Sequence, residues 1–131
     1  MATTASSIHI SDVRTIAISV RDQDRALAFY RDILGFETRL DAPMGPGRRW
    51  IEVAPPGATT SIALVAAGTA PASGAETGVR LTTDSAAAAH DGLSSAAVDV
   101  DPEIQSVPVP MFSFRDPDGN RFVIVEQPRE G

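Results

Sequence analysis

Few side chains in this sequence could hold a metal ion or act as a nucleophile. The chain has no cysteine and two histidines, which excludes disulfides, thiolate zinc sites and cysteine nucleophiles. His9 lies close to the N-terminus and His90 within a predicted helix, so we assign both a surface or packing role. The sequence also lacks a serine nucleophile elbow, a phosphate-binding glycine loop and a pair of catalytic carboxylates.

The segment MFSFRDPDGNRFVIVEQ, residues 111–127, predicts a β-hairpin. Two apolar strands flank the tetrapeptide DPDG, and Asp, Pro and Gly are typical turn residues. A calcium-binding loop would need alternating oxygen ligands over about twelve residues, which this spacing lacks. Because side chains alternate across a strand, Val123 falls on the face opposite Phe122 and Ile124. We therefore interpret these aspartates as turn formers and Val123 as a residue of the outer face.

Length and composition predict a single globular domain, residues 1–131, with a hydrophobic core of its own. The chain is 43% hydrophobic and contains no apolar run near the ~20 residues that span a bilayer. Its N-terminal stretch lacks the basic start and apolar segment of a signal peptide, so we expect a cytoplasmic protein. The net charge of −6 disfavours nucleic acid and anionic membranes as partners.

The first half of the chain predicts the element order βαβββ. Ile16, Ile18 and Val20 alternate with small polar or apolar residues, which indicates a strand with one buried face. Asp22 is placed to cap a following amphipathic helix, and Gly35 fits the left-handed residue after its end. Three further strands are predicted within residues 36–43, 48–56 and 60–67, separated by turns rich in glycine and proline.

The same order recurs in the second half. Strand positions Ile16 and Val79 lie 63 residues apart, as do the two predicted helix caps, Asp22 and Ser85. An internal duplication explains this spacing. We therefore expect one module at about 13–66, a second at about 78–127, and a flexible linker at about 67–77.

Taken together, the stretches LAFYRDILGF and RDPDGN within two βαβββ modules resemble the vicinal oxygen chelate superfamily. This group includes glyoxalase I, extradiol dioxygenases and bleomycin resistance proteins, and the resemblance covers residues 13–127. It implies an α+β fold in which the two modules form a curved mixed sheet around a cleft. It also implies a homodimer.

Catalytic members of the superfamily hold a divalent metal on four cleft-facing residues, usually His, Glu or Gln. By resemblance, these positions fall near Thr15, Glu52, Gly78 and Val123. Glycine and valine offer no side-chain donor, and a threonine hydroxyl is a poor one. Since a catalytic divalent site generally needs about three protein ligands, Glu52 alone would not hold an ion. We therefore predict neither a metal nor another cofactor.

Without metal ligands, the strand faces opposite the helices, which form the concave surface of the sheet, predict a binding cleft lined largely by small side chains. Trp50 and Met111 would give it apolar contacts, and Met44 in a nearby loop would add to them. Arg80 could bind a carbonyl or phenolate oxygen of a ligand; we expect it instead to pair with Glu52, because an unpaired buried charge is costly. The predicted ligand-binding residues are Met44, Trp50, Glu52, Arg80, Met111, Ser113 and Val123.

The sequence favours binding of a bulky aromatic or cationic small molecule without catalysis. By resemblance, the function would be antibiotic sequestration that gives self-resistance to a bacterium, with a bleomycin-like, quinone or enediyne-type ligand. A metal-dependent lyase, isomerase or dioxygenase is the alternative. A third hypothesis is a non-metal enzyme or metabolite sensor with Glu52 as a general base, which would require a raised pKa.

Overall fold

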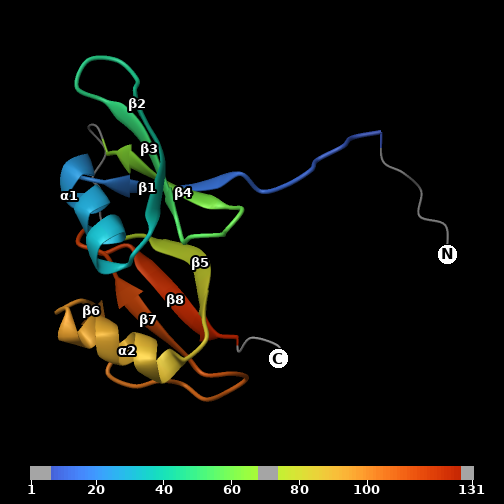
Figure 1. Ribbon diagram of the computed structural model, residues 1–131, viewed down its shortest axis with the longest axis vertical. Helices are drawn as coiled ribbons and strands as arrows, with labels where there is room; N and C mark the ends of the chain where they lie inside the picture. Colours follow the sequence, from blue (N-terminus) through green and yellow to red (C-terminus); the bar gives the residue numbers. More distant parts are fainter. Residues whose placement is uncertain (1–6, 68–73, 128–131) are drawn as a thin grey trace.

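The computed structural model describes residues 7–67 and 74–127, and it contains two modules of the predicted order. In Figure 1 the modules lie one above the other, with one helical segment beside each sheet. The first module contains β1 Thr15–Val20, α1 Gln23–Ala28, the π-helix η1 Phe29–Ile33, β2 Glu37–Pro43, β3 Arg49–Ala54 and β4 Ser61–Ala66. The second contains β5 Glu76–Thr83, α2 Ala86–Ser95, β6 Asp99–Val100, β7 Met111–Arg115 and β8 Arg121–Glu126.

Each module forms a four-stranded mixed sheet, with strand orders β1-β4-β3-β2 and β5-β8-β7-β6. The first strand of each module pairs in parallel with the last, and the other pairs are antiparallel. The predicted α+β class and paired βαβββ modules are confirmed. The predicted linker 67–77 falls largely on residues 68–73, outside the described part, and its last two residues already belong to β5.

The two helix caps perform the same task in both modules. The Asp22 carboxylate accepts a hydrogen bond from the backbone N–H of Arg25 at 3.1 Å, and the Ser85 hydroxyl accepts one from Ala88 at 3.1 Å. Gly35 has φ +77°, as expected for the residue after a helix. The repeat that the sequence predicts at the caps is therefore present in the structure.

The first helical segment differs from the uninterrupted α-helix that the sequence pattern predicts. After Ala28 it widens into a π-helix, in which the N–H of Leu34 bonds to the carbonyl of Phe29 at 3.2 Å. The consecutive residues Phe29 and Tyr30 are both buried. The wider turn reconciles helical hydrogen bonding with two neighbouring aromatic side chains packed inward, which the regular 3.6-residue periodicity does not anticipate.

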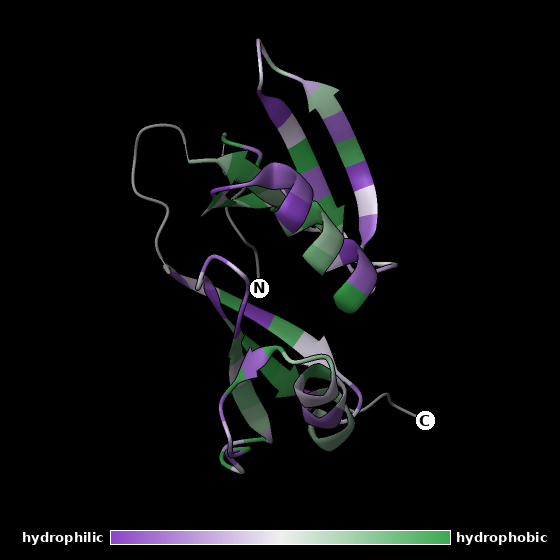
Figure 2. Ribbon diagram, turned by 90° about the vertical axis from the view of Figure 1, so that its left-hand side faces the viewer, coloured by the Kyte–Doolittle hydropathy of each residue, from purple (hydrophilic) through white to green (hydrophobic). Residues whose placement is uncertain are grey.

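The strand faces are those that alternation predicts. Residues that alternate along β1, β5, β7 and β8 lie in the core or pack against it: Ile16, Ile18, Val79, Leu81, Phe112, Phe114, Phe122 and Ile124. Figure 2 shows hydrophobic and hydrophilic residues alternating along the strands. The face opposite the helices is therefore fixed without a shift of register, and it carries the residues on which a ligand site could be built.

The DPDG turn does more than reverse the chain, because it joins the two modules. Asp116 is 5% exposed, and its Oδ1 accepts hydrogen bonds from the backbone N–H groups of Asp118 at 2.9 Å and Asn120 at 2.8 Å. Its Oδ2 accepts from the Tyr30 hydroxyl at 2.7 Å and the Asn120 side-chain amide at 3.0 Å. Tyr30 belongs to the first module, so one carboxylate bonds both halves.

Further contacts close this junction. The Asn120 amide also donates to the carbonyl of Ser19 at 3.0 Å, and Asp118 Oδ1 accepts from the N–H of Arg21 at 3.0 Å. The ring of Tyr30 packs edge-on against Phe122 at 6.0 Å between centroids. Burial and the neighbouring Asp116 charge both raise the pKa of Tyr30, so its hydroxyl remains a donor. Asp116 and Asp118 therefore form the turn, as the sequence predicts, and they also bind the first module, which the sequence does not predict.

We expect Tyr30→Phe to lower the free energy of unfolding by about 1–3 kcal/mol, because it leaves a buried carboxylate oxygen with one donor fewer. Urea denaturation measures this. Thr60→Val is a suitable control: the Thr60 hydroxyl donates to the carbonyl of Val13 at 2.9 Å in an exposed position, and its removal should cost about 0.5 kcal/mol or less. Equal losses in both variants would contradict the assigned role of the junction.

Candidate functional site

On the outer face of the first sheet, Trp50 and Glu52 lie side by side. Both are on β3, where they alternate with the buried core residues Ile51 and Val53. The Trp50 indole N–H donates to Glu52 Oε2 at 2.7 Å. Trp50 is only partly buried, so its ring is held in one orientation by the carboxylate while part of its surface remains open to a ligand.

Glu52 is held by protein groups on both of its oxygens. It is 4% exposed, and Oε1 accepts from the Ser61 hydroxyl at 2.9 Å while Arg14 lies 3.4 Å from Oε2. The hydrogen bond from Trp50, with those from Ser61 and Arg14, lowers the pKa of Glu52 and outweighs burial, which would raise it. Glu52 is thus ionised near neutral pH and a poor general base, contrary to the third hypothesis.

The expected pair between Arg80 and Glu52 is not formed. Arg80 lies on β5 of the second module, where its guanidinium donates to the carbonyl of Gly78 at 3.3 Å. The cation beside Glu52 is Arg14, which precedes β1 and reaches across β4. The prediction was wrong because it placed both residues on one continuous concave surface, whereas β3 and β5 belong to separate sheets.

A cavity of about 200 Å³ lies on the outer face of the second sheet. Arg80, Val123 and Ser113 are aligned across β5, β8 and β7, since Arg80 pairs with Val123 and Val123 with Ser113. Met111 lies at the start of β7 and lines the same cavity. Four of the seven predicted site residues are thus brought together, with an apolar floor and two guanidinium groups, those of Arg80 and Arg121.

The rim of this cavity carries acidic and amide side chains beside Arg121, and the sequence did not predict these residues as part of a site. Asp101, Glu103 and Gln105 line it from the loop that follows β6. The Asp101 carboxylate accepts from Arg115 at 2.8 Å, and Glu103 is exposed. The acidic and amide residues clustered in VDVDPEIQ could have indicated a polar site. However, β6 is only two residues long, so strand alternation does not predict that the loop after it lies beside β7.

The seven predicted residues therefore fall into three places. Arg80, Met111, Ser113 and Val123 line one cavity; Trp50 and Glu52 form a pair on the other sheet; and Met44 lies with neither. Met44 is 46% exposed in the loop between β2 and β3, where its backbone N–H donates to the carbonyl of Arg48 at 2.9 Å.

The donor set does not fit the metal site that the superfamily implies. Of the four corresponding positions, Thr15 donates its hydroxyl to the carbonyl of Ser61 at 3.1 Å, and Gly78 and Val123 have no donor. Both Glu52 oxygens are already hydrogen-bonded. Within residues 7–67 and 74–127, no three His, Cys, Asp or Glu side chains lie close enough to hold an ion.

His90 packs inside the second module. Its Nε2 lies 2.7 Å from the carbonyl oxygen of Asp101, and its ring meets Phe112 edge-on at 5.0 Å between centroids. His9 is exposed in the segment before β1. The two histidines lie on separate parts of the fold, and the packing contacts of His90 agree with the role that the sequence predicts for it.

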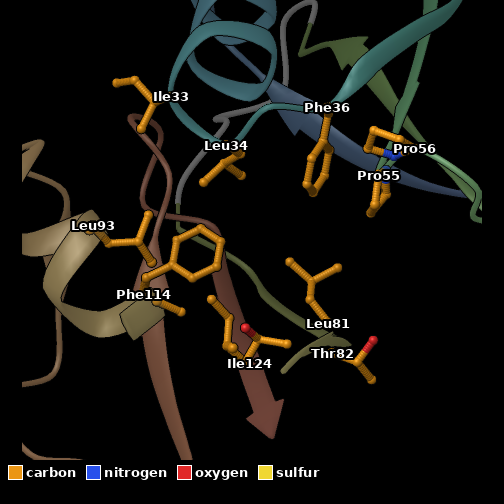
Figure 3. A pocket seen from close by; sticks show the side chains of 13 residues that line it. Ile33, Leu34, Phe36, Pro55, Pro56, Leu81, Thr82, Leu93, Phe114 and Ile124 are labelled. Atoms are coloured by element: carbon orange, nitrogen blue, oxygen red, sulfur yellow. The ribbon is translucent and has the colours of Figure 1, made fainter. Parts of the chain in front are cut away.

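A second, apolar cavity of about 390 Å³ lies between the modules on the opposite face of the second sheet. Figure 3 shows Leu34 and Phe36 of the first module directed toward Leu81, Phe114 and Ile124 of the second. Leu81 follows Arg80 in β5, and Ile124 follows Val123 in β8, so the side chains of each pair point to opposite faces of the sheet. β5 and β8 therefore separate this cavity from the one that Arg80 and Val123 line. Strand alternation places Leu81, Phe114 and Ile124 on the face that meets the helices, but it does not predict a space between the two modules.

Paired βαβββ modules, each with an open outer sheet face, define the fold class of this chain. No helix in the described part of the chain is both long and apolar enough to cross a membrane. The sequence matches the Glyoxalase/Bleomycin resistance protein/Dioxygenase superfamily model over residues 12–124, and the chain belongs to this superfamily.

Solved structures of similar proteins agree with this assignment. A superfamily member from Sphaerobacter thermophilus DSM 20745 is 35% identical, with a TM-score of 0.83 and coverage of 90% of this chain and 98% of that one. TnmS3, an antibiotic binding protein from Streptomyces sp. CB03234, is also 35% identical, with a TM-score of 0.81 and coverage of 91% and 98%. Protein YetH of Bacillus subtilis (strain 168) is 42% identical over 55 residues, 42% of this chain and 46% of YetH.

The Glu52 network predicts how stability depends on pH. Because the folded-state pKa is lowered, the contribution of ionised Glu52 is present above the ordinary carboxyl pKa and is lost as pH falls through the folded value. The difference in unfolding free energy between the wild type and Glu52→Gln should therefore shrink from about pH 7 to about pH 3. Urea denaturation across this range measures it.

Glu103→Gln is the matched control, since Glu103 is exposed; this change should alter stability at neutral pH little. A difference between the wild type and Glu52→Gln that grows on acidification would contradict the assignment.

Proposed function

We propose that this protein binds an antibiotic-like small molecule and sequesters it without chemical change. The observation that carries the proposal is the outer face itself: the metal-ligand positions hold Thr15, Gly78 and Val123, and the one carboxylate, Glu52, is bonded on both oxygens. The similarity to the antibiotic binding protein TnmS3 supports the same function. Sequestration would give self-resistance to a bacterium that produces or meets a bleomycin-like, quinone or enediyne-type compound.

The geometry suits a bulky aromatic ligand. Met111 and Val123 offer an adaptable apolar floor, and Arg80 is exposed above it, so that its guanidinium can reach a carbonyl or phenolate oxygen. The partly open indole of Trp50, held by Glu52, offers a flat surface on the other sheet. The exposed carboxylate of Glu103 at the rim and the net charge of −6 favour a cationic group on the ligand.

The proposal includes a homodimer in the bacterial cytoplasm, with neither nucleic acid nor membrane as a partner. The Trp50–Glu52 pair lies on the first sheet and the cavity that contains Arg80 lies on the second. That cavity has a volume of only about 200 Å³. A bulky ligand needs a larger enclosed volume, since pockets for drug-sized molecules are about 300–1,000 Å³. A second copy of the chain would supply the missing wall. The net charge of −6 disfavours a polyanionic partner.

Titration of Trp50 fluorescence tests the binding proposal, because Trp50 is the single tryptophan. Among a bleomycin-type glycopeptide, a mitomycin-like quinone and an enediyne-type aromatic, at least one is expected to change the emission saturably. Sequestration implies nanomolar affinity, about −12 kcal/mol. Arg80→Ala should weaken binding by about ten- to a hundredfold, since a hydrogen bond to a charged group contributes about 1.5–3 kcal/mol.

Arg31→Ala is the matched control, because Arg31 is an exposed arginine on η1 that pairs with Asp32 at 3.1 Å. It should leave the affinity unchanged. Trp50→Phe should abolish the fluorescence signal while calorimetry still detects the ligand. Absence of both a fluorescence change and heat across the whole panel would contradict the proposal.

A metal-dependent lyase, isomerase or dioxygenase is the second candidate, favoured by the position of Glu52 at one of the superfamily's ligand sites. Elemental analysis of protein purified without chelator separates the two. The binding proposal expects no stoichiometric nickel, zinc, iron or manganese. One equivalent of any of these ions, lost in Glu52→Gln but retained in Glu103→Gln, would favour the metal enzyme.

A further inference from the structure

The apolar cavity between the modules is separate from the ligand site described above and large for the interior of a small protein. Its volume is about 390 Å³, and it shares no lining residue with the cavity that contains Arg80 and Val123. Protein interiors are packed with few voids larger than a water molecule. A space of this size falls within the range of small-molecule pockets, about 300–1,000 Å³.

The side chains around this cavity suit an uncharged occupant. Of the described residues that line it, none carries a charge, and only Thr82 and Thr83 have polar side chains. The Thr83 hydroxyl already donates to the carbonyl of Ser85 at 3.3 Å and accepts from the N–H of the same residue at 3.3 Å. A water at the buried base, beside Phe114 and Ile124, would lack the two to four polar partners that hold an ordered water. The base therefore favours an apolar molecule.

The wall from the first module is fixed in place by the π-helix. Because the N–H of Leu34 bonds to the carbonyl of Phe29, the carbonyl of Tyr30 is left to accept another donor. It accepts the N–H of Phe36 at 2.9 Å, and the rings of these two residues pack at 5.9 Å between centroids. Tyr30 is itself bound to the second module through Asp116. Collapse of Phe36 into the cavity would break these contacts, so the space is preformed.

Gly92 keeps the opposite wall open. It lies within α2 on the same helical face as Ala89 and Leu93, and all three line the cavity. Glycine is less favourable in a helix interior than any residue except proline. No close approach of the chain requires it here, since a Cβ at this position would meet no described atom beyond its own helix within 4 Å. The missing side chain thus weakens the helix and leaves space that a larger residue would fill.

We propose that this cavity is a second binding site, for an uncharged bicyclic aromatic molecule held between Phe36 and Phe114. A cavity of ~150 Å³ lined by Leu, Ile and Phe binds benzene, so about 390 Å³ accommodates two fused rings. Figure 3 shows the two phenylalanine rings entering the space from different modules, and aromatic walls favour a flat aromatic occupant. Ile33 and Gly92 are exposed where they line the cavity and mark its entrance. This site does not depend on the proposed function.

Titration of the full-length chain with 1-aminonaphthalene tests the proposal, because this neutral bicyclic amine emits at shorter wavelength in apolar surroundings. Saturable binding of one molecule per chain, with a shift of the emission to the blue, is expected. 1-Naphthoate has the same two rings and a carboxylate. It should not displace the amine, because the cavity offers no partner for a buried charge.

Gly92→Leu should weaken the binding of 1-aminonaphthalene at least about tenfold, because the leucine side chain fills the space that the rings need. The urea midpoint of this variant should not fall, since leucine favours the helix more than glycine does. Ala87→Leu is the matched control: it adds the same side chain at an exposed position on the opposite face of α2. Its affinity for the amine should equal that of the wild type.

A crystal of the full chain exposed to 1-bromonaphthalene would locate the site directly, through the anomalous scattering of bromine. The signal is expected between Phe36 and Phe114. A signal confined to the cavity that Met111 and Val123 line would contradict the proposal.

Other results would overturn the second site. These are the absence of saturable binding to the wild type and an equal effect of Gly92→Leu and Ala87→Leu on the affinity. An affinity for the amine that falls as the protein concentration rises would assign the cavity to a second copy of the chain and would also overturn it. Gly92→Leu should leave antibiotic binding unchanged, because Gly92 lies outside the cavity that contains Arg80. Failure of the antibiotic-binding proposal is therefore recognised separately.

Discussion

The structure depends on one buried carboxylate. Asp116 bonds two backbone N–H groups of its own turn, which fixes the turn, and the Tyr30 hydroxyl, which fixes the turn against the first module. A buried charge with four donors is stabilised, whereas the same charge with fewer would be costly. The aromatic rings of Tyr30, Phe114 and Phe122 pack together beside it. The relative position of the two sheets follows from this junction, and with it the geometry of everything built on their outer faces.

The outer faces show how a superfamily scaffold can be used for binding. Of the positions that would ligate a metal, two have no side-chain donor, and the remaining carboxylate has become a support for Trp50. A low pKa suits that role, because an ionised Glu52 accepts hydrogen bonds from an indole, a hydroxyl and a guanidinium together. The same feature makes Glu52 unsuited to abstract a proton near neutral pH. One set of contacts thus favours recognition and disfavours catalysis.

Much of the fold could be predicted from sequence because it depends on local rules. Alternation along the strands, the caps Asp22 and Ser85, and the 63-residue repeat each follow from nearby residues, and the structure contains all three. The predictions that were wrong or incomplete concern residues whose partners lie far away in the sequence. Arg14 rather than Arg80 meets Glu52, since strand order decides which sheet each residue joins. The inter-module role of DPDG and the π-helix depend on aromatic packing between halves, which periodicity does not encode.

The junction has a consequence for how the chain could be divided. Tyr30 and Ser19 lie early in the first module, and Asp116 and Asn120 lie late in the second, so the halves adhere through residues that are distant in the sequence from the peptide that connects them. Covalent continuity between Ala67 and Gly74 is therefore not what aligns the sheets. Two separately produced fragments would carry complementary surfaces, and a circularly rearranged chain with new ends in this stretch would retain every contact of the junction.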